Sequence, residues 1–339
     1  MGMVLQRKGG ALTAAEEREL AWPDLPLASW ADTCVTVHRW TQVMGKVRLA
    51  CTPWINHSWH VTLYVTAQGL TTGPMAFGQL VFQIDIDFSN HELVVSVMDG
   101  RRRGFALEPF SVADFYEELM EALDALGLGV ALVTQPNEVA DETNLDADHE
   151  HAAYDPDATN KFWRMLVSSD RVLRRFRSRF LGKASPVHFF WGSFDLAVTR
   201  FSGRLAPQHP GGVPHLPDPV TREAYSHEVS SAGFWPGTVG GPVDYPAFYS
   251  YAYPGPEGFA AAAVGPAAAF FHQTLGEFVL PYEAVRTAPS PDDMLLEFLE
   301  TTYAAAADLG RWDRASLERA EGPPRGIARL SQPRLHPVP

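Results

Sequence analysis

The sequence predicts an α+β protein of two packed halves, each with antiparallel strands and flanking helices. Long segments repeat apolar residues at the spacing of one helix face, and shorter segments alternate apolar with polar residues, as half-buried strands do. Asp99-Gly100 separates two alternating segments of the first half, which is a strong signal for a two-residue hairpin turn. Strands joined by such turns form an antiparallel meander.

The first half spans residues 20–135 and opens with a helix from about Asp32 to Cys51. The polar face of this helix carries His38, Gln42, Lys46 and Arg48, and its apolar positions recur at helical spacing: Val37, Trp40, Val43, Met44 and Val47. Alternation then predicts strands at residues 60–67, 80–88, 93–97 and 101–107. A capping box at Ser111–Asp114 begins a second helix that ends at Gly127, and a short strand is expected at residues 130–134.

Residues 136–157 are acidic and without pattern, and we interpret them as an exposed linker. The second half, residues 158–315, begins with a helix capped by Asp155 and running to Phe180. Later segments predict a strand-turn-strand unit at residues 183–204, strands at 225–235 and 248–253, and a helix from Ser290 to Gly310. The Pro- and Arg-rich tail, residues 321–339, is expected to be disordered.

The two halves share an outline. A helix is followed by Thr52-Pro53 or Ser185-Pro186, and then by a strand with the pattern Leu-x-Val-Thr, at residues 63–66 or 196–199. The ungapped match between them is weak, so a distant internal duplication stays an open alternative.

The composition excludes some classes of partner. The 339 residues carry 27 Lys and Arg against 40 Asp and Glu, a formal net charge of -13, which repels nucleic acid and anionic membrane surfaces. Cys34 and Cys51 are predicted to be buried free thiols of a reducing compartment. The first residues lack the apolar region of a signal peptide and no apolar run reaches the length of a membrane span, so we expect a cytoplasmic protein. The oligomeric state is left open.

Sequence signatures of common nucleotide enzymes, hydrolases and zinc proteases are absent. His57 and His60, with His188 or His227, could form a site for a divalent metal. Their spacing suits neither one helix face nor one strand face, so we favour histidines that hydrogen-bond their neighbours. No metal and no cofactor is therefore expected.

The segment Lys183–Arg204 combines five aromatic residues with a histidine, an aspartate and three cations, which is typical of a pocket wall. On its second strand, Asp195 and Thr199 share one face and Leu196 and Val198 the other. Pairing with the strand of His227 would bring a histidine and a carboxylate together beside two tryptophans. The predicted acid–base residues are His188, Asp195, His227 and Glu228. The predicted ligand-binding residues are Lys183, Trp191, Arg200, Arg204, Ser230, Trp235, His57 and His60.

Four blocks of the sequence resemble the DUF5996 family of uncharacterised bacterial proteins: WTQVMGKVRLA at residues 40–50, NHSWHV with LYVT at 56–66, SPVHFFWGSFDLAVTRFSGR at 185–204 and SHEVSSAGFWPG at 226–237. The resemblance covers about residues 20–315, and its long third block is specific. It implies a soluble bacterial protein that folds as this unit. It implies no activity, so no catalytic residue is carried over.

These observations predict a pocket that binds a small polar or acidic molecule, with Lys183, Arg200 and Arg204 holding its negative groups. Acid–base catalysis on that molecule is one form of this prediction, and whether the protein is an enzyme is left open. The alternative is a non-catalytic ligand-binding or scaffold protein in which the same polar residues satisfy one another.

Overall fold

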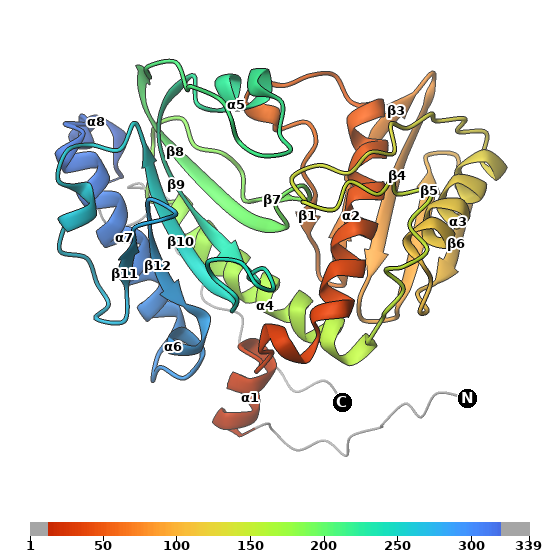
Figure 1. The fold of residues 1–339 in the computed structure, drawn as a ribbon, viewed down its shortest axis with the longest axis horizontal. Helices are drawn as coiled ribbons and strands as arrows, with labels where there is room; N and C mark the ends of the chain where they lie inside the picture. The colour runs from red at the N-terminus through yellow and green to blue at the C-terminus, as the bar shows by residue number, and fades with distance from the viewer. Residues whose placement is uncertain (1–12, 320–339) are drawn as a thin grey trace, which may run out of the picture.

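The predicted α+β class is confirmed. A computed structural model describes residues 13–319, and within this range it holds two antiparallel sheets of six strands each and eight α-helices (Figure 1). The helix α1 (Ala14–Ala21) begins before the expected start of the first half. The tail predicted to be disordered, residues 321–339, lies outside the described residues.

The first sheet has the strand order β1-β2-β4-β5-β6, with β3 paired to β4. Its strands are β1 (Tyr64–Val65), β2 (Gly69–Thr71), β3 (Met75–Phe77), β4 (Leu80–Asp87), β5 (Glu92–Val97) and β6 (Arg102–Ala106). The predicted turn at Asp99-Gly100 joins β5 to β6, and the capping box of Ser111 and Asp114 begins α3 (Val112–Ala125). The indole of Trp40 on α2 (Ala31–Cys51) stacks on Phe115 of α3 at 4.8 Å between ring centroids.

Of the strands predicted for the first half, one is shorter than expected and one is absent. The strand expected at residues 60–67 is reduced to the two residues of β1, although Leu63 makes a further bridge. Residues 130–134 form no strand. The backbone amide of Leu145 donates a hydrogen bond to the carbonyl oxygen of Thr134, but this bond is isolated and does not extend into the repeated pairing of a sheet.

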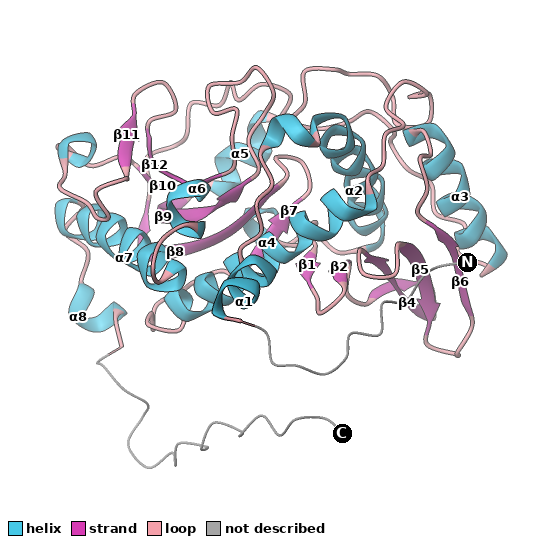
Figure 2. Ribbon diagram, turned by 90° about the horizontal axis from the view of Figure 1, so that it is seen from below, coloured by secondary structure: helices cyan, strands magenta, loops and turns pink. Residues whose placement is uncertain are grey.

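The second sheet has the order β11-β12-β10-β9-β8-β7. Its strands are β7 (His188–Phe190), β8 (Asp195–Leu205), β9 (His227–Trp235), β10 (Ala247–Tyr253), β11 (Phe270–His272) and β12 (Glu277–Pro281). The helices α4 (Pro156–Arg177), α6 (Tyr282–Arg286) and α7 (Pro291–Leu309) pack on one face of it, as Figure 2 shows for α4 and α7. The remaining helices are α5 (Asp218–Ala224) and α8 (Arg314–Leu317), and short 3-10 turns lie at Leu27–Ser29, Asn56–Ser58 and Phe259–Ala261. None of the helices in residues 13–319 combines the length and the apolar composition that a bilayer crossing requires.

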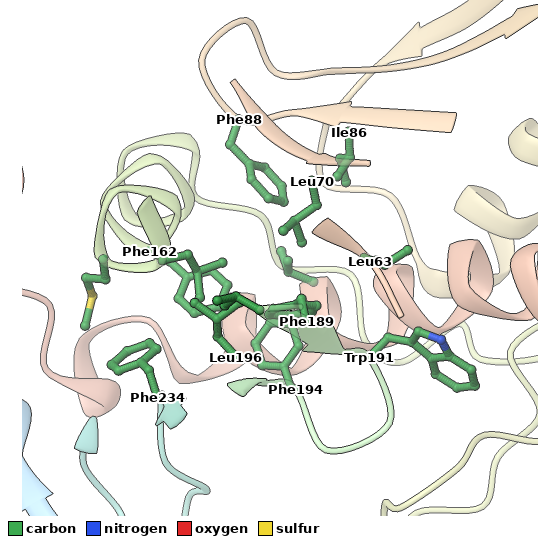
Figure 3. Packing of buried hydrophobic residues seen from close by; sticks show 14 of the residues in the cluster. Leu63, Leu70, Ile86, Phe88, Phe162, Phe189, Trp191, Phe194, Leu196 and Phe234 are labelled. Carbon is green, nitrogen blue, oxygen red and sulfur yellow. The ribbon is translucent and has the colours of Figure 1, made fainter. Parts of the chain in front are cut away.

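The two halves share one hydrophobic core. Leu63, just before β1, and Phe189 of β7 exchange two backbone hydrogen bonds of 2.9 Å, which links the sheets edge to edge. Figure 3 shows Leu63, Phe189 and Leu196 in a single cluster with Phe162 of α4. The two sheets differ in construction, since only the first branches at β3, and an internal duplication is not shown.

Residues 136–155 lack regular structure, and α4 begins at Pro156, but part of this acidic segment is buried, unlike the exposed linker that its composition suggested. Leu145 and Asp148 are each only 1% exposed. The buried guanidinium of Arg39 on α2 forms ion pairs with Asp141 (2.7 Å) and Asp148 (3.1 Å). Because a buried Arg without a partner is costly, the helix and the acidic segment hold each other in place.

Candidate functional site

A cavity of about 450 Å³ lies against the face of the second sheet that α4 and α7 leave free. Side chains of β8, β9 and β10 form its floor, α5 and the loop before it cover it, and Asn56–Ser58 with residues 137–138 close its sides. Figure 1 shows α5 at the top of the view, beside the short orange turn of Asn56–Ser58. The lining is mostly aromatic and apolar, and includes Trp54, Trp59, Phe190, Trp191, Phe201, Tyr225, Tyr249 and Tyr251.

Strand alternation builds the floor. Asp195, Ala197, Thr199 and Phe201 of β8 line the cavity, whereas Leu196 and Val198 between them are buried in the core. The pairing of β9 with β8 and β10 puts Val229 and Ser231, and then Tyr249 and Tyr251, on the same face. In mid-floor the hydroxyls of Thr199 and Ser231 are 2.9 Å apart. The two faces therefore follow the period of two that the sequence predicts for β8.

Two carboxyl groups mark one end of the cavity. Asp195 accepts hydrogen bonds from Ser193 Oγ (2.5 Å) and from the hydroxyl of Tyr249, and burial raises its pKa against the opposing effect of these donors. Glu138 lines the cavity beside Gly192, where a Cβ would collide with its carboxylate. Burial, and then the charge of Asp195, raise the pKa of Glu138 to about 7. Burial and the charge of Asp195 also raise the pKa of Glu277 on β12 to about 7.

Three tyrosines surround this carboxyl pair. Tyr249 reaches Asp195 across Gly233 of β9, where a side chain would collide with the tyrosine ring. The hydroxyl of Tyr251 lies 3.0 Å from that of Tyr225. Burial raises the pKa of all three phenols, so they stay protonated and act as hydrogen-bond donors at neutral pH.

The polar face of α2 positions Glu138. The side-chain amide of Gln42 exchanges two hydrogen bonds with the backbone of Asn137, at 2.8 and 2.9 Å, and Lys46 donates to the Asn137 side chain at 2.9 Å. Burial lowers the pKa of Lys46 to about 8. His38 bonds through Nε2 to the carbonyl oxygens of Trp191 and Gly192. One helix face therefore orients both the loop of Glu138 and the turn between β7 and β8.

His57 lies at the other end of the cavity. Its Nδ1 is 3.0 Å from the carbonyl oxygen of Ala224, and its Nε2 is 2.8 Å from the ammonium of Lys183. An ammonium can only donate, so the ring carries its proton on Nδ1 and is neutral. Burial lowers the pKa of His57, as this assignment requires.

Backbone strain concentrates around the cavity. Five non-glycine residues with left-handed φ angles of 56–61° either line it or directly precede a lining residue: His57, Ser58, Glu138, Phe194 and His215. The other two such residues in the described chain, His91 and Arg311, lie outside the lining. Non-glycine residues in this region cost about 1–3 kcal/mol each and gather at functional sites.

Of the twelve predicted site residues, three line the cavity: His57, Trp191 and Asp195. Lys183 contacts it indirectly through His57. The indole nitrogen of Trp191 donates to the carbonyl oxygen of Val61 at 2.6 Å, which fixes this wall.

The predicted anion-holding arginines lie elsewhere. Arg200 is 1% exposed on the opposite face of β8, with its guanidinium 3.4 Å from the ring centroid of Phe176 and 4.3 Å from that of Tyr303. Arg204 is exposed and pairs with Glu228 at 2.6 Å. Neither guanidinium reaches the cavity lining.

The register of β8 and β9 separates the predicted acid–base pair. His227 pairs with Leu205, whereas Leu196, next to Asp195, pairs with Phe234, so the two side chains lie at opposite ends of the ladder. Strand pairing alone, which sequence alternation predicts, does not specify which residues stand opposite one another.

The other predicted residues are also outside the lining. His188 is 1% exposed among aromatic rings, and burial lowers its pKa to about 3. The Nδ1 of His60 lies against the backbone of Ile55. Ser230 is buried on the core face of β9, and Trp235 packs on a small cluster around Val243.

Sequence reasoning missed Glu138 and the tyrosines of β10. Glu138 stands in a segment whose composition resembles a solvated loop, and no local pattern distinguishes it from its acidic neighbours. Tyr249 and Tyr251 had a usable signal, because aromatic residues alternate with small ones along that strand. Within residues 13–319, no three His, Cys, Asp or Glu side chains gather in a way that could hold a metal ion.

Comparison with known proteins gives one match. A family model described as a family of unknown function (DUF5996) matches residues 22–319, which is most of the chain. No curated protein and no solved structure matches it.

Proposed function

The chain belongs to the DUF5996 family of unknown function, and we propose that it binds a small polar molecule in the cavity at Asp195 and Glu138 and exchanges protons with it. The observation that carries this proposal is the presence of two carboxyl groups, those of Glu138 and Asp195, in the lining of one aromatic cavity, where burial raises the pKa of both. Titratable groups shifted by burial and by a like charge are typical of sites that move protons.

The arrangement suits general acid–base chemistry. A carboxyl group whose pKa is about 7 is populated in both protonation states at neutral pH, so Glu138 can accept a proton from a bound molecule or donate one to it. Asp195 is held by Ser193 and Tyr249, which leaves it suited to orienting the ligand. The aromatic walls reduce the exposure of both groups to water, Asp195 being buried and Glu138 half-buried.

Strain supports a functional reading of the same cavity. Five left-handed non-glycine residues around one cavity cost folding free energy that a merely structural role would not require. The alternative is a scaffold protein whose cavity residues only satisfy one another. Glu138 argues against it, because its carboxylate has no hydrogen-bond partner among the described residues.

A thermal-shift screen of a metabolite library tests the proposal. Val220 of α5 lines the cavity, and Val220→Trp fills it from above, whereas Val213→Trp alters an exposed residue of the preceding loop that does not line it. Compounds that raise the unfolding temperature of the wild type should lose their effect in Val220→Trp and keep it in Val213→Trp. Hits that survive Val220→Trp, or a screen without hits, would favour the scaffold alternative.

We also propose that the protein is cytoplasmic and binds neither nucleic acid nor membranes. Its support is the formal net charge of -13 and the two cysteines, which are both unpaired. Cell fractionation with antibody detection tests the location.

A further inference from the structure

We infer that the ligand carries a protonated amine at Glu138 and Asp195, with an aromatic or aliphatic body against the tryptophan walls. This inference rests on the proposed function and names the chemical class of the ligand. The sequence predicted a small polar or acidic molecule, and a protonated amine agrees with the polar alternative but not with the acidic one.

The charge of the cavity favours a cation. The acidic groups of its lining are Glu138 and Asp195, and its one basic side chain, His57, is neutral because Lys183 donates to it. The nearest cations lie behind the lining: Lys46 donates to the side chain of Asn137, and Lys183 donates to His57 at the end of the cavity away from the carboxyl pair. An anionic group bound at this end of the cavity would face two carboxyl groups, while the ammonium of Lys183 lies at the other end, behind His57.

Glu138 lacks the donors that an ammonium would supply. Its carboxylate lies in an enclosed position beside Gly192, and no described residue donates a hydrogen bond to it. Glu138 is half-buried in the cavity lining, and a charge-assisted hydrogen bond from an ammonium would supply the donor that its carboxylate lacks within the protein.

The walls fit the remainder of such a ligand. Indoles of Trp59 and Trp191 line the cavity together with the ring of Phe190. Aromatic faces attract cations and also bury apolar groups, so an amine with a hydrophobic body is matched at both ends. The volume of about 450 Å³ accommodates one small ligand of this kind.

Calorimetric titration of the full chain at neutral pH tests the inference with three probes of one shape: benzylamine, benzyl alcohol and benzoate. Benzylamine should bind about tenfold or more tighter than benzyl alcohol, because the ammonium gains a Coulomb interaction at the carboxyl pair that the alcohol lacks. Benzoate should bind weakest. In Glu138→Gln the preference for benzylamine should fall at least about fivefold while the affinity for benzyl alcohol changes little.

Each outcome has one meaning. Equal or tighter binding of benzyl alcohol or benzoate overturns the amine inference and leaves the cavity as a ligand site. An unchanged preference in Glu138→Gln also overturns it, and circular dichroism verifies that this variant folds. If none of the three probes binds but the library screen yields neutral or anionic compounds that Val220→Trp abolishes, only the inference fails. If no compound of any charge binds, the proposed function fails with it.

Discussion

The hydroxyl of Tyr249 on β10 donates a hydrogen bond to the carboxylate of Asp195 on β8, crossing the intervening strand at Gly233. Glycine leaves room for this contact, since a Cβ at position 233 would collide with the tyrosine ring and with the carbonyl oxygen of Leu196. The carboxyl group is therefore held from two strands away.

Replacing this glycine should disturb both the floor and its hydrogen bond. Gly233→Ala is expected to lower the free energy of unfolding by about 1–3 kcal/mol through overpacking. Gly129→Ala is the matched control, because nothing lies near the position of its Cβ and its φ is not positive, and it should be neutral or slightly stabilising. Urea denaturation compares the two, and equal midpoints would contradict the packing of Tyr249 over Gly233.

Glu138 should make the stability depend on pH. Its pKa rises from 4.5 to about 7 on folding, so the folded state binds more protons than the unfolded state between these values. The free energy of unfolding therefore falls as pH increases through this window, and the raised pKa values of Asp195 and Glu277 act in the same direction. Glu138→Gln should flatten the profile, gaining about 1–3 kcal/mol over the wild type at pH 8 and little at pH 4.

Glu118→Gln on the exposed face of α3 is the control for this profile. It removes one carboxylate without touching the cavity, and its curve should run parallel to that of the wild type. Urea midpoints measured from pH 4 to pH 8 decide the matter. A Glu138→Gln curve parallel to the wild type would show that Glu138 titrates like an exposed residue.

Replacing Arg200 should affect stability as replacing a core residue does. Arg200→Ala removes a buried side chain from between Phe176 and Tyr303 and leaves a backbone carbonyl without its donor, so it should cost about 2–4 kcal/mol. Arg204→Ala, on the exposed end of the same strand, should stay within about 1 kcal/mol. Both variants should keep the ligand-induced thermal shift of the wild type. Loss of that shift in Arg200→Ala with unchanged stability would return Arg200 to the ligand site.

Periodicity predicted most of the fold because it reports local geometry. Alternation along β8 assigned Asp195 and Thr199 to one face, and the same rule puts Arg200 on the core face, although its charge suggested a ligand contact. Register is a long-range property, so alternation could not show that His227 stands opposite Leu205 rather than near Asp195.

The polar face of α2 shows a second limit. Gln42 and Lys46 recur at helical spacing as solvent-facing residues do, yet both are buried against residues 137–138. A buried polar face and a solvated one have the same pattern in sequence. The two cases differ only in whether the acidic segment covers the helix face, and that segment has no sequence pattern that predicts its position. The contact of Gln42 and Lys46 with Asn137 brings the neighbouring Glu138 to the cavity.

The most direct test of the account follows the side-chain carboxyl carbons by ¹³C NMR during a pH titration, with Glu138→Gln used to assign the signal. Glu138 should titrate near pH 7 in the free protein, and benzylamine should move its midpoint to lower pH, because a bound cation stabilises the carboxylate. A signal that titrates near the ordinary 4.5, and that no compound displaces, would contradict the claim that Glu138 exchanges protons in a ligand site.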